Sequence, residues 1–255
     1  MDAAALQKQV LELRRQLAES RARNRAMWSL LAEISQRLQA SSTSIKAAVS
    51  SLLDYDIFWD GSTQHEFLET IDDSVDQGSN LIVLMTLAFR SEASSLEMKP
   101  ETHTLQEILS TVLDTILAKM PGLELKVDFP PEGEPVFVDY GYLAVALRLL
   151  LEVLIEPEPP PAQIELLAAE AENSWLLDIG PIPETIGVAI GHLCQDRFDE
   201  LLTSDNFLPL SPEKLLKLFT ASRIFRLQDI QLDVQTGETE KAGLRLSIPV
   251  ARPGQ

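Results

Sequence analysis

Few side chains in this sequence are suited to acid–base, nucleophilic or metal chemistry. The 255 residues include three histidines, His65, His103 and His192, and a single cysteine, Cys194. No two histidines are close enough in sequence to suggest a shared metal site, and one cysteine makes neither a thiolate cluster nor an intrachain disulfide. We therefore expect no bound metal and no cofactor, and the lone thiol favours a reducing compartment.

The charge is strongly acidic but unevenly distributed. The chain has 39 Asp and Glu against 21 Lys and Arg, a net charge of −18. Residues 1–25 carry +3 and the remainder −21, which argues against a general role in binding nucleic acid or an anionic membrane. No stretch approaches the roughly 18 apolar residues of a membrane span, and no signal-peptide pattern opens the chain. We expect a cytoplasmic protein without membrane insertion.

A seven-residue pattern of apolar or small side chains runs through residues 6–52. Its steps alternate strictly between four and three residues, and no Gly or Pro interrupts it. The positions are Leu6, Val10, Leu13, Leu17, Ser20, Asn24, Met27, Leu31, Ile34, Leu38, Ser41, Ile45, Ala48 and Leu52. With Val10 at heptad position a, Asn24 also falls at a, where one buried polar residue fixes a parallel two-stranded register. The pattern predicts a coiled-coil homodimer; the alternative is one amphipathic helix on its own globular body.

After Met27, the residues that flank this pattern become more apolar. This change predicts a stem over residues 1–26 and a helical hairpin over residues 27–93. Small residues gather at 40–44, and the helical pattern breaks at 54–62. Ser62 or Thr63 can cap a second helix, with Glu66 placed for a capping box. Asp72, Asp73 and Asp76 on that helix fit a solvated face better than a metal site. Two such helices per chain in a parallel dimer give a four-helix bundle.

Residues 100–252 are predicted to form an α+β sandwich with one sheet and helices on one face. Helical patterns cover 105–119, 140–155, 185–203 and 212–227. Strand-like alternation covers 124–129, 135–138, 163–168, 175–179, 230–234 and 244–250. Prolines make residues 157–161 a loop.

Residues 34–47 resemble the phospho-acceptor motif of sensor histidine kinases. They read Ile-Ser-Gln-Arg-Leu-Gln-Ala-Ser-Ser-Thr-Ser-Ile-Lys-Ala, against the family pattern Ile-Ser-His-Glu-Leu-Arg-Thr-Pro-Leu-Thr-Ser-Ile-Lys-Gly. Gln36 stands at the phospho-acceptor His, and its amide nitrogen, conjugated with the carbonyl, has no comparable lone pair. Arg37 replaces the acidic residue that follows. Gln36 lies at heptad position f, off the seam, so we expect it on the solvent face.

The sandwich resembles the ATP-binding domain of the same family without its metal ligands. The family motif Asp-x-x-x-Leu-x-x-x-Leu-x-Asn-Leu-Leu-x-Asn-Ala-x-Lys corresponds here to the stretch that begins at Asp139. Leu149 and Val153 stand at the two Asn positions, and Glu156 stands at the Lys position. Magnesium prefers oxygen ligands, so aliphatic side chains at these positions remove the coordination and the triphosphate clamp.

The glycine motifs are altered as well. Residues 178–183, Asp-Ile-Gly-Pro-Ile-Pro, resemble the family's Asp-x-Gly-Pro-Gly-Ile-Pro with the second Gly deleted. The resemblance implies that Asp178, as the adenine-recognising carboxylate, and Gly180 are a vestigial nucleotide site. The family's Gly-Leu-Gly-Leu, where backbone amides approach the phosphates, corresponds to Leu-Leu-Lys-Leu at 215–218. Side chains at glycine positions prevent a close backbone approach.

The resemblance covers residues 26–251 and implies a degenerate histidine kinase core. The implied function is a catalytically inactive dimeric scaffold or regulator in two-component signalling. Its partner would be a response-regulator receiver domain or an authentic histidine kinase, and the docking residues would be Gln36, Arg37, Gln39 and Ala40. One alternative is a histidine phosphotransferase that passes phosphate through His65, which is otherwise a solvated residue at a helix start. Another is a nucleotide held at Asp178 without hydrolysis.

Overall fold

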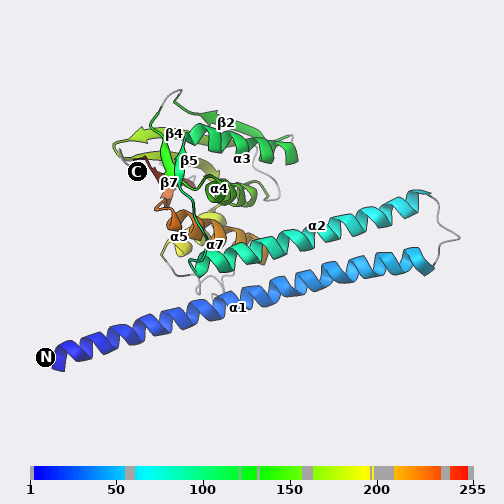
Figure 1. The fold of residues 1–255 in the computed structure, drawn as a ribbon, viewed down its shortest axis with the longest axis horizontal. Coiled ribbons are helices and arrows are strands. Elements are labelled where there is room, and N and C mark those ends of the chain that lie inside the picture. The colour runs from blue at the N-terminus through cyan, green and yellow to red at the C-terminus, as the bar shows by residue number, and fades with distance from the viewer. Residues whose placement is uncertain are drawn as a thin grey trace. The chain divides into compact units, whose positions relative to one another are not determined.

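The computed structural model describes residues 3–54, 61–120, 122–130, 133–156, 163–195, 197, 210–236 and 242–251. The chain divides into two compact units, residues 1–86 with 198–203 and residues 87–197 with 204–255. In the described residues, the first unit consists of two long helices, of which the second extends to residue 92 in the other unit, and the second unit combines helices with β-strands (Figure 1). In the described part of the chain, no helix is both long and apolar enough to cross a membrane.

Helices α1 (Ala3–Asp54) and α2 (Gly61–Glu92) lie side by side as an antiparallel hairpin (Figure 1). Small side chains allow a close contact, because the Ser41 hydroxyl donates to the Ser74 carbonyl and Gly78 faces Leu38. The heptad positions Met27, Leu31, Ile34 and Ala48 are buried within one chain. The buried residues of α2 also recur every three or four positions: Ser74, Gly78, Leu81, Leu84, Ala88 and Ser91.

The part of α1 that was predicted to be a stem continues the same helix. No break separates residues 3–26 from the hairpin, so α1 is one helix of 52 residues. Unlike the buried half of the seam, Val10, Leu13 and Leu17 are 44%, 57% and 51% exposed. In the described part of the chain, the heptad pattern therefore packs against α2 in one half, and its apolar side chains are exposed in the other half.

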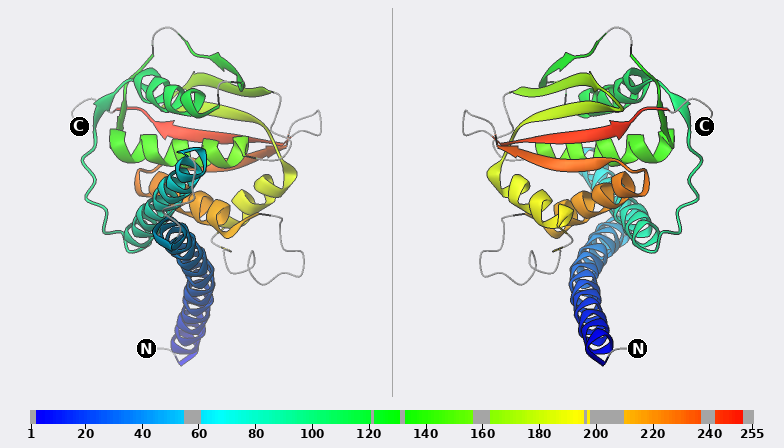
Figure 2. Two further views of the ribbon diagram at one scale, coloured as in Figure 1. Left: turned by 90° about the vertical axis from the view of Figure 1, so that its right-hand side faces the viewer. Right: turned by 90° about the vertical axis from the view of Figure 1, so that its left-hand side faces the viewer.

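The second unit contains a five-stranded sheet with the strand order β2-β4-β5-β7-β6. Only the β2–β4 pair is parallel. The strands are β2 (Glu124–Asp128), β4 (Gln163–Ala171), β5 (Ser174–Ile182), β6 (Gln231–Thr236) and β7 (Ala242–Pro249). Helices α3 (Leu105–Lys119), α4 (Tyr140–Ile155), α5 (Glu184–Cys194) and α7 (Pro212–Leu227) pack against the sheet (Figure 2).

The two faces of this sheet differ in burial. Ile164, Leu166, Leu177, Ile179, Leu244 and Leu246 are buried under the helices. The residues between them in sequence, including Glu165, Leu167, Asp178 and Arg245, lie on the open face. Helix α4 forms the centre of the core, because nine of its residues are buried. The predicted fold class, a helical N-terminal part followed by an α/β sandwich, is confirmed.

Some predicted elements differ from the structure. The strand predicted at 135–138, β3 (Val136–Val138), pairs with β1 (Glu101–His103) in a separate two-stranded sheet. The sequence analysis missed β1, because Glu-Thr-His has no apolar alternation. Helix α5 ends at Cys194 rather than at residue 203, and residues 198–203 lie outside the described residues, as does the proline-rich loop at 157–161.

Candidate functional site

Gln36, which the resemblance places at the phospho-acceptor position, lies on the outer surface of α1. Ile34 is fully buried, and Leu38 and Ser41 are half-buried toward α2. Gln36 therefore points to the opposite side of the helix and is exposed, together with Arg37, Gln39 and Ala40. The structure thus brings these four residues together on an accessible helix surface, as the heptad position predicts. None of them is a nucleophile for phosphoryl transfer.

His65 lies at a different level of the hairpin. It is in the second turn of α2, whereas Gln36 is 18 residues from the end of α1. With a rise of 1.5 Å per residue, the two positions are separated by roughly 20 Å along the hairpin axis. The exposed imidazole Nε2 is 3.1 Å from a Glu69 carboxylate oxygen, an ordinary (i, i+4) surface contact.

Helix α4 corresponds to the motif that holds the metal ion in the family that the sequence resembles. The first residue of the motif, Asp139, is present, but aliphatic residues stand at its two Asn positions. Asp139 caps α4 by accepting a hydrogen bond from the Tyr142 N–H at 3.0 Å, and it accepts another from the Lys99 N–H at 2.7 Å. Leu149 and Val153, at the two Asn positions, are 5% and 0% exposed. These aliphatic side chains are part of the apolar core.

A lysine with three carboxylates joins α4 to α7. Lys217 Nζ lies 3.0 Å from Glu156 Oε1, 3.2 Å from Glu152 Oε2 and 3.4 Å from Glu213 Oε1. The Lys217 and Glu152 side chains are only 11% and 13% exposed. Burial alone would lower the pKa of Lys217, but the charges of Glu152, Glu156 and Glu213 outweigh it, so the pKa lies above the ordinary value of 10.5. We call these four residues the Lys217 cluster.

The Lys217 cluster involves two of the motifs that the resemblance places at the nucleotide. Glu156 stands at the family's Lys position and Lys217 at its second glycine of Gly-Leu-Gly-Leu. The structure does bring these two positions together, but as an ion pair. Sequence reasoning missed Glu152 and Glu213. The (i, i+4) spacings of Glu152 with Glu156 and of Glu213 with Lys217 were the available signal.

The backbone of residues 215–218 is not available to a phosphate. These residues lie inside α7 rather than in a loop. The Leu215 N–H donates to the Ser211 carbonyl at 3.0 Å, and the Ser211 hydroxyl caps the helix by accepting from the Lys214 N–H at 3.3 Å. The amides that would face an anion are therefore satisfied by the protein itself.

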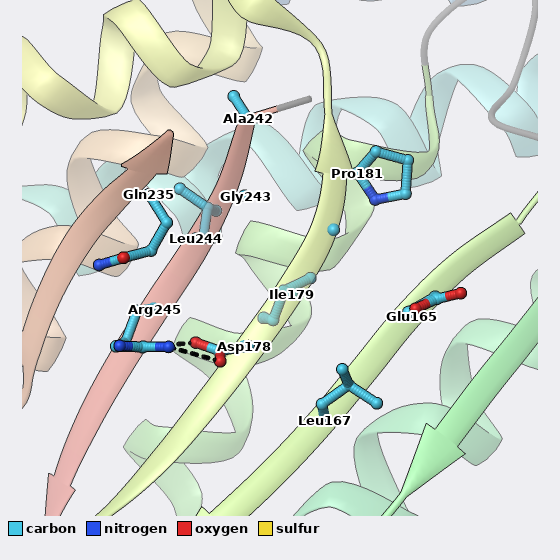
Figure 3. Close-up of a pocket in the computed structure, with 11 residues that line it drawn as sticks. Glu165, Leu167, Asp178, Ile179, Pro181, Gln235, Ala242, Gly243, Leu244 and Arg245 are labelled. Atoms are coloured by element: carbon cyan, nitrogen blue, oxygen red, sulfur yellow. Dashed lines mark hydrogen bonds and ion pairs between the residues drawn. The ribbon is translucent and has the colours of Figure 1, made fainter. Parts of the chain in front are cut away.

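Asp178 and Gly180 lie apart from the other motifs. Strand alternation turns Leu177 and Ile179 toward the helices and Asp178 toward the open face (Figure 3). There, Arg245 of β7 donates to both Asp178 oxygens, at 2.7 and 2.8 Å. These hydrogen bonds raise the pKa of Arg245. The structure therefore differs from the expectation for Asp178, because one nucleotide cannot contact this carboxylate and the α4–α7 positions on opposite faces of one sheet.

The open face is hollowed at this ion pair by a shallow cavity of about 470 Å³. Glu165, Leu167, Gln235 and Arg245 line it together with Gly180 and Gly243, and all of these except Gly180 are labelled in Figure 3. A Cβ on Gly180 would lie 3.6 Å from the Gly243 Cα, so the paired glycines let the cavity reach the backbone. Because Arg245 is neutralised by Asp178, the cavity offers no strong anion site.

No protein-family model matches the sequence, and no curated protein matches it. Solved histidine kinase structures, however, are similar in fold. The histidine kinase AdeS of Acinetobacter baumannii aligns with a TM-score of 0.58 at 15% identity, over 84% of this chain and 98% of that one. Full-length ShkA in complex with AMPPNP aligns with a TM-score of 0.55 at 13% identity, over 88% of this chain and 46% of that one. The fold of this chain is therefore similar to that of these histidine kinases.

Proposed function

We propose that this protein is a catalytically inactive, dimeric histidine-kinase-like scaffold or regulator of two-component signalling in the cytoplasm. It acts by binding a response-regulator receiver domain or a histidine kinase, and it requires no cofactor. The histidine-kinase-like fold supports the signalling context, and the residues at the motif positions support the absence of catalysis.

The Lys217 cluster is the observation that carries this proposal. A triphosphate site needs magnesium ligands, a cation for the phosphates and free backbone amides. At the corresponding positions this chain has buried Leu149 and Val153, the carboxylate of Glu156, and a helix whose amides are already bonded. Glu152 and Glu156 would repel a triphosphate, because the single ammonium of Lys217 offsets only part of the charge of the carboxylates around it.

An exposed apolar stripe on α2 supports the dimer. Leu68, Val75, Ile82 and Phe89 follow one another at intervals of seven residues, and each is about half exposed. On α1, Trp28 and Val49 are exposed directly after the buried Met27 and Ala48. Because the helices are antiparallel, these residues flank the same side of the hairpin as the α2 stripe. A second hairpin on this side would complete a four-helix bundle.

The exposed surface around Gln36 supports docking of a partner. The resemblance places the receiver-facing residues at Gln36, Arg37, Gln39 and Ala40, and all four side chains are accessible. A receiver domain that binds there meets an amide instead of an imidazole, so it is held without receiving a phosphoryl group.

A thermal-shift experiment with ATP and magnesium tests the loss of nucleotide binding. A ligand at 100 times its Kd stabilises a protein by roughly 2.7 kcal/mol, and an ATP-binding histidine kinase domain serves as the positive control. We expect no shift for this protein. A shift that saturates with ATP would contradict the proposal, and the Asp178→Asn variant would then show whether the open-face cavity holds the nucleotide.

Binding to receiver domains tests the scaffold role. We expect a receiver domain from the same genome to bind the full chain and the Arg37→Glu variant to bind about tenfold more weakly, because the charge at the docking surface is reversed. Lys46→Glu, the same charge change elsewhere on α1, is the matched control. Incubation with phosphorylated receiver should leave the chain unlabelled. An acid-labile label that disappears in His65→Ala would instead establish the phosphotransferase.

A further inference from the structure

The stem of α1 carries an apolar seam that is exposed in the described part of the chain. Val10, Leu13 and Leu17 occupy heptad positions a and d and are about half exposed. The seam residues of the hairpin half of α1 are buried against α2 instead. A row of aliphatic side chains at a and d is stable in water only when it packs against another helix. The stem is therefore a surface for a partner helix.

The residues that flank the seam determine which helix fits. In parallel coiled coils, position g of one helix faces position e of the next heptad on the other helix. Between residues 7 and 23, the e positions are Gln7, Arg14 and Arg21, and the g positions are Gln9, Gln16 and Arg23. No Asp or Glu occupies an e or g position in this range. The flanks are either neutral or positive.

Pairing of two identical stems forms no interhelical ion pair. Gln9 would face the second chain's Arg14, and Gln16 would face its Arg21, so every arginine at e meets an amide. The two stems would also bring together two segments of +3 each, which repel one another. The seam thus favours a two-stranded coiled coil. The residues at positions e and g, however, do not favour pairing with a second copy of this chain, because they offer no opposite charges to each other.

We propose that the stem pairs in parallel with a helix of a different chain that has a leucine-type seam and Glu or Asp at its g positions. Its carboxylates would face Arg14 and Arg21 across the coil. Asn24, at position a, adds a requirement, because a buried amide is best satisfied by a polar residue at the same level of the partner. The inference rests on the proposed dimer and deepens it: the second hairpin belongs preferentially to a kinase-like chain with an acidic stem.

Subunit exchange between two versions of the full chain tests this preference. The probe carries Gln9→Glu, Gln16→Glu, Arg14→Gln and Arg21→Gln, which gives it acidic g positions and uncharged e positions. A control with Lys8→Glu and Arg15→Glu has the same change of four charges, but at the outer position f. Differently tagged wild-type and variant chains are mixed, and the heterodimer is quantified by native mass spectrometry at low and at high salt.

We expect the heterodimer with the probe to exceed its statistical proportion by about five-fold at low salt, since each of two ion pairs contributes modestly. The excess should shrink at high salt and should be much smaller for the control. A statistical mixture, or equal excess for probe and control, would overturn the inference. If neither wild-type nor mixed chains dimerise at all, it is the proposed dimer that fails.

Discussion

The two units of this molecule differ in how much of their apolar surface is buried within one chain. The α/β unit closes its core around α4 and fills its motif positions with aliphatic side chains and the Lys217 cluster. The hairpin buries one side of each helix but leaves the stem seam and the α2 stripe exposed. The α/β unit buries its core within one chain, whereas the hairpin would be completed by the dimer that we propose.

This difference indicates where function remains. In the α/β unit, the residues at the motif positions make hydrogen bonds within the chain, as in the Ser211 cap and the Arg245–Asp178 pair. Among the described residues, exposed apolar side chains at seven-residue spacing lie on α2 of the hairpin, which supports the proposed role in binding proteins.

The largest effect is expected at the α2 stripe. Ile82→Asp would place a charge at the centre of the proposed helix interface, and desolvating an unpaired carboxylate is costly. We expect dimerisation to weaken by at least about 100-fold, measured by analytical ultracentrifugation. Asn80→Asp makes the same charge on a neighbouring exposed position outside the stripe and should leave the dimer intact. Equal dimerisation of both variants would show that α2 is not the interface.

The next effect is expected in the Lys217 cluster. Lys217→Met leaves the carboxylates of Glu152, Glu156 and Glu213 without their shared cation, and we expect a loss of about 2–3 kcal/mol. The melting temperature of the α/β unit should fall by roughly 5–10 °C. Lys214→Met is the control, because Lys214 Nζ is 3.8 Å from a Glu156 oxygen and more exposed; its cost should stay below about 1 kcal/mol.

A double variant sharpens the interpretation of this cluster. Lys217→Met with Glu152→Met replaces the least exposed ion pair by apolar side chains of similar size, and such replacements are often neutral. We expect it to recover more than half of the stability that Lys217→Met loses. No recovery would mean that the cluster acts through its packing rather than through charge.

A smaller effect is expected at the start of α4. Asp139→Ala removes the acceptor for the Tyr142 and Lys99 N–H groups, and we expect a loss of about 1–2 kcal/mol in chemical denaturation. Asp139→Asn keeps an acceptor for only one of these N–H groups, because Oδ1 accepts from Tyr142 and Oδ2 from Lys99, so we expect an intermediate loss of about 0.5–1 kcal/mol. A loss of the same size in both variants would assign the effect to the charge or to the Lys99 hydrogen bond instead of to the helix cap.

The smallest effect is a pH dependence. The pKa of Lys217 is higher in the folded protein than its ordinary value of 10.5. Its stabilising contribution is therefore complete below pH 10.5 and is lost as the pH rises through the folded value. The difference in stability between wild type and Lys217→Met should be constant from pH 7 to 9 and should narrow above 10.5. A difference that grows in this alkaline range would contradict the ion-pair account.

Much of this architecture was predictable from the sequence. The heptad pattern identified Met27, Leu31, Ile34 and Ala48 among the buried residues of α1, but it did not predict the buried Leu30, and it could not say whether α2 or a second chain covers the seam. The alternation of the apolar residues Trp175, Leu177 and Ile179 along one strand predicts that Asp178 lies on the opposite face. The alignment of motifs did not take this alternation into account. The Lys217 cluster was not predictable, because its ion pairs depend on the packing of α4 beside α7.

The continuity of α1 has a geometric consequence for anything bound along it. A straight helix of 52 residues is about 78 Å long, and Leu17 and Gln36 are separated by about 28 Å on it. A helix fixes direction as well as distance, since each residue turns the chain by about 100°. Inserting seven residues between them would add about 10 Å and would hardly rotate one surface relative to the other. Inserting one residue would rotate the stem seam by about 100° relative to the proposed docking surface. The spacing between stem and docking surface is therefore expected to vary only in steps of seven residues.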